Sequence, residues 1–185
     1  QPKFPFLCLT VSGGHTQIVL VKSVEDMKVI GETLDDAAGE AFDKSAKILG
    51  LPYPGGPLID KYGKEGDKLK FVFGKHKVGK LNFSYSGIKT SILRVIEKRV
   101  AKNPNFIKEN LNDLCASIQH TIIDILIKKI MKASKEMGIN EIAIAGGVSA
   151  NSYIRKRLLE LEEKYNKKVF IPKFEYCTDN AAMIA

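Results

Sequence analysis

A pair of glycines near the start of the chain joins two short apolar runs, and this turn constrains the fold. The runs cover residues 6–11 and 18–21 and are rich in the apolar and β-branched residues typical of strands. Between them lies Ser12-Gly13-Gly14-His15-Thr16-Gln17. Glycine accepts positive φ angles, so the pair suits a tight turn between strands. Backbone N–H groups and side-chain donors at such a turn also suit a bound phosphate. Taken alone, the segment fits a plain hairpin and an anion site equally well.

Strands and helices alternate along the rest of the chain. A third strand is expected over residues 27–33. After several helical segments, an apolar strand at 141–145 leads through a glycine-containing loop into a helix at 152–165 and a strand at 169–172. This alternation predicts a parallel βαβ unit. The sequence therefore predicts an α/β fold with a mixed sheet, in which a three-strand meander is followed by alternating helices and strands.

Local signals place the helices between these strands. Asp35 or Asp36 is a natural N-cap for a helix that stops at Gly50. Residues 51–57 contain three prolines and two glycines, so they are expected to be irregular, with a short helix at 58–62 after them. The remaining helices are expected to run to about residue 101 and from about 106 to 137.

The composition is that of a globular chain. Hydrophobic residues make up 44% and charged residues 27% of the sequence, and no apolar run approaches the roughly 20 residues of a membrane span. Cys8, Cys115 and Cys177 lie far apart, which fits neither a disulfide framework nor a zinc site, so a cytoplasmic location is expected. Because both ends look cut, the chain is expected to be part of a longer protein.

The charge balance leaves one question about partners open. A net charge of +8 permits an acidic partner such as nucleic acid without requiring one. Residues 61–80 carry seven lysines around the apolar segment Phe71-Val72-Phe73. This stretch is either a solvated loop or a contact surface for a phosphate backbone.

Candidate ligand groups recur at double-glycine segments, which occur at 13–14, 55–56 and 146–147. Open α/β sheets bind ligands beyond the carboxyl ends of their strands, and the last pair follows a strand and opens a helix that can hold an anion. Asn151 adds an amide there. Asp179 also follows a strand and opens a helix, as either an N-cap or a cation ligand.

Several common site patterns are absent from the sequence. It has neither the Walker spacing nor a G-x-G-x-x-G segment, which leaves P-loop and Rossmann sites without support. It also lacks G-x-S-x-G and H-E-x-x-H, so neither a serine hydrolase nor a zinc protease is favoured.

Six segments form a more specific pattern. They are Val11-Ser12-Gly13-Gly14-His15-Thr16, residues 35–44, Tyr53-Pro54-Gly55-Gly56-Pro57, residues 83–90, residues 145–151 and residues 177–183. In this order they resemble the tRNA adenosine threonylcarbamoyltransferase family of the bacterial TsaD type, formerly labelled a glycoprotein endopeptidase. The resemblance covers residues 5–185.

The resemblance implies an actin-like, Hsp70-like ATPase fold of two ribonuclease H-like lobes. The chain would be a segment of this fold (residues 1–185) that lacks the N-terminal part and the C-terminal end. The implied reaction is an acyl transfer, in which a threonylcarbamoyl group passes from threonylcarbamoyl-AMP to N6 of adenosine 37 in tRNAs that read ANN codons.

The resemblance also implies a set of site residues. Those matching the family's nucleotide or acyl-adenylate contacts are Thr10, Val11, Ser12, Gly13, Gly14, Asp43, Gly56, Asp60 and Asn151. ATP, ADP or threonylcarbamoyl-AMP is the implied bound nucleotide. Asp179 matches a catalytic ligand of one iron or zinc ion, which it binds together with an H-x-x-x-H motif. That motif is missing here, so the segment alone is expected to be inactive.

The implied partners are tRNA, a paralogous scaffold subunit and a small ATPase of the same complex, with a homodimer also possible and no membrane association. Two alternatives on the same fold remain. One is a non-catalytic paralogous scaffold, which is expected to lack the Asp179 carboxylate and the Ser12–His15 loop. The other is a small-molecule kinase or ATPase, which would turn over nucleotide without tRNA.

Overall fold

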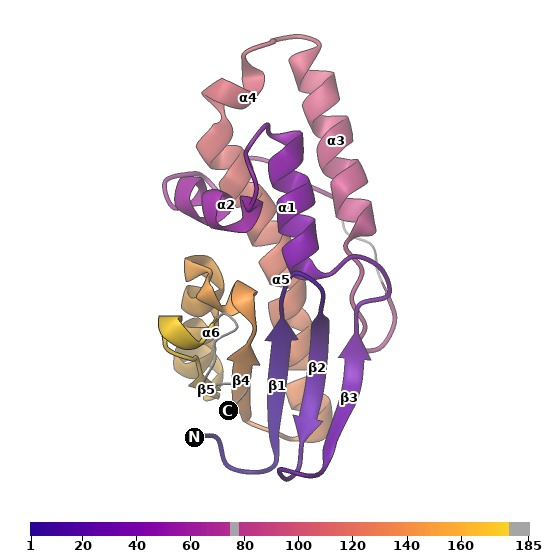
Figure 1. Ribbon diagram of the computed structural model, residues 1–185, viewed down its shortest axis with the longest axis vertical. Coiled ribbons are helices and arrows are strands. Elements are labelled where there is room, and N and C mark those ends of the chain that lie inside the picture. Colours follow the sequence, from indigo (N-terminus) through magenta and orange to yellow (C-terminus); the bar gives the residue numbers. More distant parts are fainter. Residues whose placement is uncertain (75–77, 178–185) are drawn as a thin grey trace.

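The computed structural model describes residues 1–74 and 78–177. Within them, strands form a five-stranded sheet in the order β3-β2-β1-β4-β5 (Figure 1). The strands are β1 Phe6–Val11, β2 Thr16–Val21, β3 Met27–Glu32, β4 Glu141–Ala145 and β5 Lys168–Phe170. The first three are antiparallel neighbours, β4 pairs parallel with β1, and β5 pairs parallel with β4. The predicted meander and mixed sheet are confirmed.

The helices lie behind the sheet and beyond the carboxyl ends of β1 and β4 (Figure 1). They are α1 Ala38–Ile48, α2 Gly55–Gly63, α3 Ser86–Val100, α4 Phe106–Glu109, α5 Leu111–Met137 and α6 Ser152–Tyr165, with short 3-10 turns η1 Gly147–Ala150 and η2 Phe174–Tyr176. The long helix α5 crosses behind the sheet and continues past it to contact α1 and α2 (Figure 1). Because β1 and β4 point toward α1 and α2, their carboxyl ends face these helices (Figure 1).

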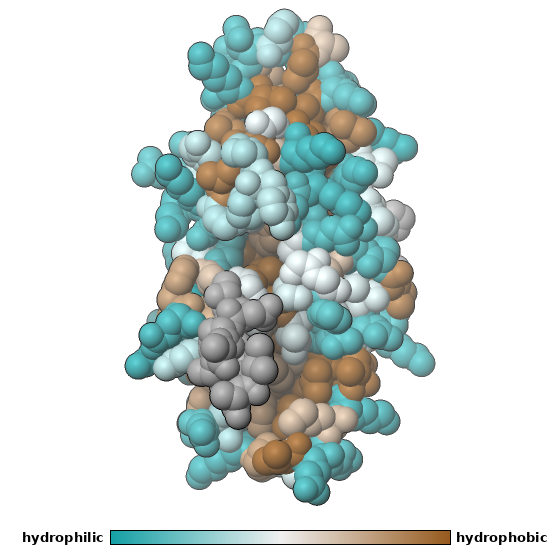
Figure 2. All heavy atoms as spheres, viewed as in Figure 1, coloured by the Kyte–Doolittle hydropathy of each residue, from teal (hydrophilic) through white to brown (hydrophobic). Residues whose placement is uncertain are grey.

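The core lies between the sheet and α5. Alternate residues of β1, namely Leu7, Leu9 and Val11, are fully buried, as expected for a strand with one face packed on a helix. The middle of α5 is buried on most sides because its apolar residues extend beyond a single stripe. None of the helices in the described ranges is long and apolar enough to cross a membrane. In Figure 2, hydrophilic side chains are spread over the face shown, and apolar ones gather toward its upper and lower ends.

The lysine-rich segment after α2 is attached to the core. Phe71 and Phe73 are buried, and the ring of Phe71 meets that of Phe106 edge-on with centroids 5.7 Å apart. The Lys70 ammonium lies 2.6 Å from the Asp113 carboxylate. The segment is therefore an anchored excursion from the core, and its role as a phosphate-contact surface stays a prediction. His76 and its two neighbours lie outside the described residues.

Several predicted boundaries were wrong. The strand expected over 169–172 is Lys168–Phe170, and the strand expected over 27–33 ends at Glu32. The helix expected over 106–137 is divided at Asn110, whose backbone (φ −123°, ψ 17°) leaves the helical region and separates α4 from α5. The irregular segment expected over 51–57 ends earlier, because Gly55, Gly56 and Pro57 form the first turn of α2. Proline fits there since first-turn N–H groups have no partner within the helix.

The predicted N-cap of α1 was also wrong. Ala37 occupies that position and its side chain caps nothing. The N–H of Ala38 at the start of the helix instead donates to the Thr16 hydroxyl at 2.8 Å, so a residue of β2 caps the helix. The predicted stop at Gly50 is confirmed, and this glycine has a φ of +76°, as usual after a helix.

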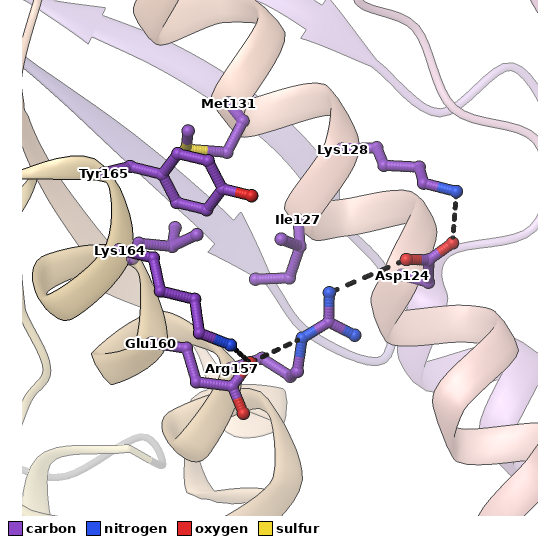
Figure 3. A pocket seen from close by; sticks show the side chains of 9 residues that line it. Asp124, Ile127, Lys128, Met131, Arg157, Glu160, Lys164 and Tyr165 are labelled. Atoms are coloured by element: carbon purple, nitrogen blue, oxygen red, sulfur yellow. Dashed lines mark ion pairs between the residues drawn. The ribbon is translucent and has the colours of Figure 1, made fainter.

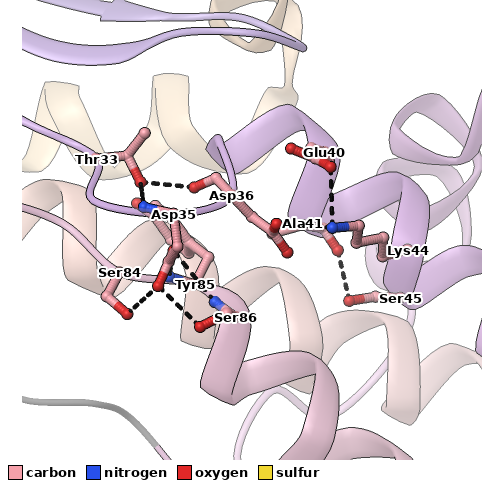
Figure 4. Close-up of polar contacts among 10 residues, drawn as sticks. All are labelled: Thr33, Asp35, Asp36, Glu40, Ala41, Lys44, Ser45, Ser84, Tyr85 and Ser86. Carbon is pink, nitrogen blue, oxygen red and sulfur yellow. Dashed lines mark hydrogen bonds and ion pairs between the residues drawn. The ribbon is translucent and has the colours of Figure 1, made fainter.

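Asp35 caps a different helix, α3 (Figure 4). One carboxylate oxygen accepts the Tyr85 N–H at 2.7 Å and the Ser86 N–H at 3.3 Å, while the other accepts the hydroxyls of Ser84 and Ser86 at 2.5 and 2.8 Å. Burial alone would raise the pKa of this carboxyl, but the hydrogen bonds outweigh it and lower the pKa. The ionised form of Asp35 therefore ties the start of α3 to the loop before α1.

Replacing Asp35 with alanine is expected to cost about 1–2 kcal/mol of unfolding free energy at neutral pH, because the start of α3 loses its cap. Since folding lowers the pKa, this contribution is full above the pKa of the unfolded chain and disappears as the pH falls through the lower folded value. Urea unfolding at neutral pH and in acid measures both effects. Asp26→Ala, which removes an exposed ion pair with Lys22, is the control and should cost less than about 0.5 kcal/mol. An equal loss in both variants would contradict the capping role.

Candidate functional site

A cavity of about 410 Å³ lies where the loops after β1 and β4 meet α1 and α2. Its lining residues are Gly13, Gly39, Phe42, Asp43, Pro54, Gly56, Pro57, Asp60, Gly147, Val148, Ala150, Asn151 and Phe174. One member of each double-glycine segment is among them. The cavity therefore occupies the place where open α/β sheets bind ligands, beyond the carboxyl ends of parallel strands.

The predicted contact residues divide into two groups. Gly13, Asp43, Gly56, Asp60 and Asn151 all line the cavity. The others, Thr10, Val11, Ser12 and Gly14, belong to the end of β1 and its turn but are not among the lining residues. Asp179 lies outside the described residues.

The ends of β1 and β4, which lead into the site, come close together at Gly146. Gly146 follows β4 with a φ of +92°, and a Cβ on it would lie 2.4 Å from the carbonyl oxygen of Val11 at the end of β1. At the next residue, Gly147, a Cβ would meet nothing within 4 Å. Gly146 thus permits the close approach of two backbones, whereas Gly147 borders open space in the cavity.

The first glycine turn is held largely by its own serine. The Ser12 hydroxyl accepts the N–H groups of Gly14 at 3.3 Å and His15 at 3.0 Å, and the Ser12 N–H donates to the His15 carbonyl at 2.8 Å. Among the hydrogen bonds of the described residues, none uses the N–H of Gly13 or of Gly147. These two cavity-lining glycines are where the backbone can donate to an anion.

Asp43 fixes the second glycine loop. Its Oδ1 accepts the N–H groups of Gly55 at 2.8 Å and Gly56 at 3.2 Å, which caps the start of α2. Gly55 is buried against Ala46 of α1, where a Cβ would lie 2.2 Å from that of Ala46. This contact lets α1 and α2 form one wall of the cavity.

Asp60 and Asn151 hold the opposite end of α2 and the start of α6. The two oxygens of Asp60 accept the hydroxyl and the N–H of Ser152 at 2.8 and 3.1 Å. Asn151 is the N-cap of α6, because its Oδ1 accepts the N–H groups of Tyr153 and Ile154 at 2.9 and 3.0 Å, and its Nδ2 donates to Gln119 of α5 at 2.7 Å. Both side chains join helices around the cavity.

The oxygen of Asp43, more than its charge, is expected to matter for stability. Asp43→Ala leaves two N–H groups without an acceptor and should cost about 1–3 kcal/mol, whereas Asp43→Asn keeps an acceptor oxygen and should cost less than about 1 kcal/mol. Urea unfolding of both variants measures the difference. Equal losses would show that the hydrogen bonds to Gly55 and Gly56 are not what stabilises this wall.

A second cavity, of about 430 Å³, lies between α5 and α6 (Figure 3). Its charged groups are paired with one another, since Asp124 lies 2.8 Å from Lys128 and 3.6 Å from Arg157, and Glu160 lies 3.6 Å from Arg157. It contains none of the predicted site residues. The cavity at the glycine loops is therefore the better candidate site.

Sequence reasoning missed the aromatic wall of the site. Phe174 lines the cavity from η2, and Arg155 of α6 lies over its ring at 5.5 Å from the centroid. Neither residue belongs to a glycine segment or to a strand end, and the sequence carried no other signal for them. Gln119, which accepts a hydrogen bond from Asn151, was also missed. It lies within a helix that the sequence assigned to the core.

Comparison with known proteins places this geometry in a family. The family model described as TsaD, tRNA N6-adenosine threonylcarbamoyltransferase, matches residues 1–185. Relatives that carry this name are 64% identical in Christiangramia forsetii, 60% in Riemerella anatipestifer and 52% in Thermosipho africanus. These alignments cover 100%, 100% and 99% of the chain, and 54% of each relative. The chain thus spans about half the length of the curated relatives it matches.

A solved structure supports the fold. The crystal structure of full-length HypF in its phosphate- and nucleotide-bound form superposes with a TM-score of 0.69 over 94% of this chain and 31% of that one, at 13% identity. The mixed sheet and the arrangement of its helices are those of an actin-like ATPase lobe, as predicted. Because its whole length matches the family model, the chain belongs to the TsaD family of tRNA N6-adenosine threonylcarbamoyltransferases.

Proposed function

We propose that the protein that carries this segment transfers a threonylcarbamoyl group from threonylcarbamoyl-AMP to N6 of adenosine 37 in tRNAs reading ANN codons. The observation that carries the proposal is the cavity at the glycine loops, in a chain of this family. ATP or ADP would occupy the same cavity. The further partners proposed are a paralogous scaffold subunit and a small ATPase, and the proposed location is the cytoplasm.

The cavity offers distinct surfaces to the parts of an acyl-adenylate. The N–H groups of Gly13 and Gly147 suit the phosphate, because backbone donors at such turns bind anions. Apolar side chains such as Phe42, Pro57 and Val148 suit the flat faces of the base. The carboxylates of Asp43 and Asp60 would orient ribose hydroxyls or the threonyl amine while they hold their loops.

The reaction needs the acyl carbon and the tRNA amine to be brought together. The N6 amine attacks the carbonyl carbon of the mixed anhydride, a C–N bond forms, the C–O bond to the phosphate breaks, and AMP leaves as the amine loses a proton to solvent. Donors at the phosphate stabilise the leaving AMP, because negative charge grows on its oxygen. Fixed loops also reduce the entropic cost of orienting the two reactants.

A divalent iron or zinc ion is a further proposal for the whole protein. Among residues 1–74 and 78–177, no three or more His, Cys, Asp or Glu side chains are grouped so that they could hold a metal. The described part does not make such a site by itself, and none of the steps above depends on one. Asp179 is the proposed ligand from this chain, and metal analysis of Asp179→Ala in a protein of the relatives' full length is the test.

The test uses the full-length protein, by which we mean a polypeptide as long as the relatives that contains this segment. Supplied with its partner subunits, threonylcarbamoyl-AMP and an unmodified tRNA, it should attach one threonylcarbamoyl group to adenosine 37, detected by nucleoside mass spectrometry. A tRNA with guanosine at position 37 is the matched control and should stay unmodified. ATP turnover without any tRNA-dependent transfer would favour a kinase or ATPase instead.

A further inference from the structure

Arg155 connects two segments that border the cavity. Its Nε donates to the Ser149 carbonyl in η1 at 2.7 Å. Its Nη2 donates to the Pro172 carbonyl at 2.8 Å and contacts the Cys177 sulfur at 3.1 Å. One half-buried guanidinium thus holds the segment 172–177 against the turn that follows Gly146-Gly147.

The same guanidinium lies over the ring of Phe174. The distance to the ring centroid is 5.5 Å, which is within the range of a cation–π contact. Phe174 lines the cavity, yet 69% of its surface is exposed. An aromatic ring that is fixed by a cation and left open at a cavity is a surface on which another flat ring can stack.

We propose that Phe174, held in place by Arg155, is the platform on which the base of the bound adenylate stacks. This rests on the proposed function, because an adenylate is the ligand expected there. Phe174, Gly13 and Gly147 line one cavity, and within the described residues no hydrogen bond uses the N–H of either glycine, so a nucleotide can meet the ring with its base and these N–H groups with its phosphate. Stacking on an aromatic side chain recognises the face of the base and needs no hydrogen bond to its edge. Arg155 acts as a positioning residue.

Binding of two probes to the full-length protein separates the base from the rest of the nucleotide. Phe174→Ala should weaken AMP binding about tenfold and leave the affinity for ribose 5-phosphate, which has no base, unchanged. Phe174→Tyr keeps the ring and should bind AMP as the unaltered protein does. Phe174 is 69% exposed in this segment, so loss of packing is not the expected cause of weaker binding, and the unfolding midpoint of each full-length variant is measured to check this.

Arg155→Met tests the positioning role. The methionine side chain is also unbranched but has no N–H group to donate a hydrogen bond. The variant should weaken AMP binding about as much as Phe174→Ala does. The double variant should lose little more than either single variant, since both changes disturb one platform. Arg157→Met, on the same helix, removes ion pairs to Asp124 and Glu160 at the other cavity and should leave AMP affinity unchanged.

The outcomes distinguish this proposal from the proposed function. Unchanged AMP affinity in Phe174→Ala, in a protein that still modifies tRNA, would overturn the stacking platform alone. A weakened AMP affinity in a protein that never transfers a threonylcarbamoyl group would overturn the proposed function alone. Weakened binding of a tRNA anticodon stem–loop with unchanged AMP affinity would assign the ring to the RNA and overturn the platform for adenylate.

Discussion

Replacing Gly146 with alanine is expected to cost about 3 kcal/mol or more of unfolding free energy, because two penalties act at one residue. Its φ of +92° is a backbone conformation that residues with a side chain rarely adopt. The added Cβ would also lie 2.4 Å from the Val11 carbonyl oxygen. Backbone cannot move aside as a flexible side chain can. Relief of the contact requires β4 to shift from β1, and both strands are central to the sheet.

Gly147→Ala is the matched control, one residue away. A Cβ there would meet nothing within 4 Å and the residue has no positive φ, so the fold should lose less than about 0.5 kcal/mol. Because Gly147 lines the cavity, the added methyl should instead weaken AMP binding. Urea unfolding and AMP titration of the full-length variants measure the two effects. If Gly146→Ala unfolds at the same urea concentration as Gly147→Ala, the close approach of β1 and β4 is not needed.

The positions of the strands along the chain could be predicted because each strand carries its own signal, but their order in the sheet, β3-β2-β1-β4-β5, was not predicted. The apolar runs around Gly13-Gly14 have strand length, and the run before Gly146 leads directly into a helix, so the meander and the parallel unit follow. Helix ends were less predictable, because distant residues supply the caps. Thr16 caps α1 and Asp35 caps α3, and neither partner lies next to its helix in the sequence.

The cavity-lining residues could be predicted in part, but what their side chains contact could not. The motifs include Asp43 and Asn151, and the structure shows that Asp43 accepts the Gly55 N–H and that Asn151 accepts the Tyr153 N–H at the start of α6. A pattern along the chain cannot separate a ligand contact from a loop contact, since both need the same oxygen near the same turn. Phe174 reaches the cavity, and Arg155 reaches the ring of Phe174, only through the three-dimensional fold, so no spacing in the sequence identifies them.

Replacing Gly39 with alanine is expected to reduce the threonylcarbamoyl transfer proposed for the full-length protein about 100-fold while the protein stays folded. Gly39 lies in the first turn of α1, and its N–H donates to the Ser12 carbonyl at 3.1 Å. A Cβ there would lie 2.6 Å from that oxygen and 2.8 Å from the Cα of Gly13. Either α1 or the first glycine turn has to move, and the turn, which is the exposed partner, is the one expected to yield.

The expected loss is in function because the two effects on stability oppose each other. Alanine favours the helix by about 1 kcal/mol relative to glycine, which offsets part of the strain. Displacement of Gly13 by about 1 Å moves its N–H away from the proposed phosphate, and a misplacement of this size is enough for a loss of about 100-fold. Transfer kinetics and urea unfolding of the full-length protein measure both effects. Gly79→Ala, where a Cβ would meet nothing within 4 Å, is the control for a glycine-to-alanine change away from the cavity. Normal transfer by Gly39→Ala would mean that the position of the Ser12–Gly14 turn does not govern the reaction.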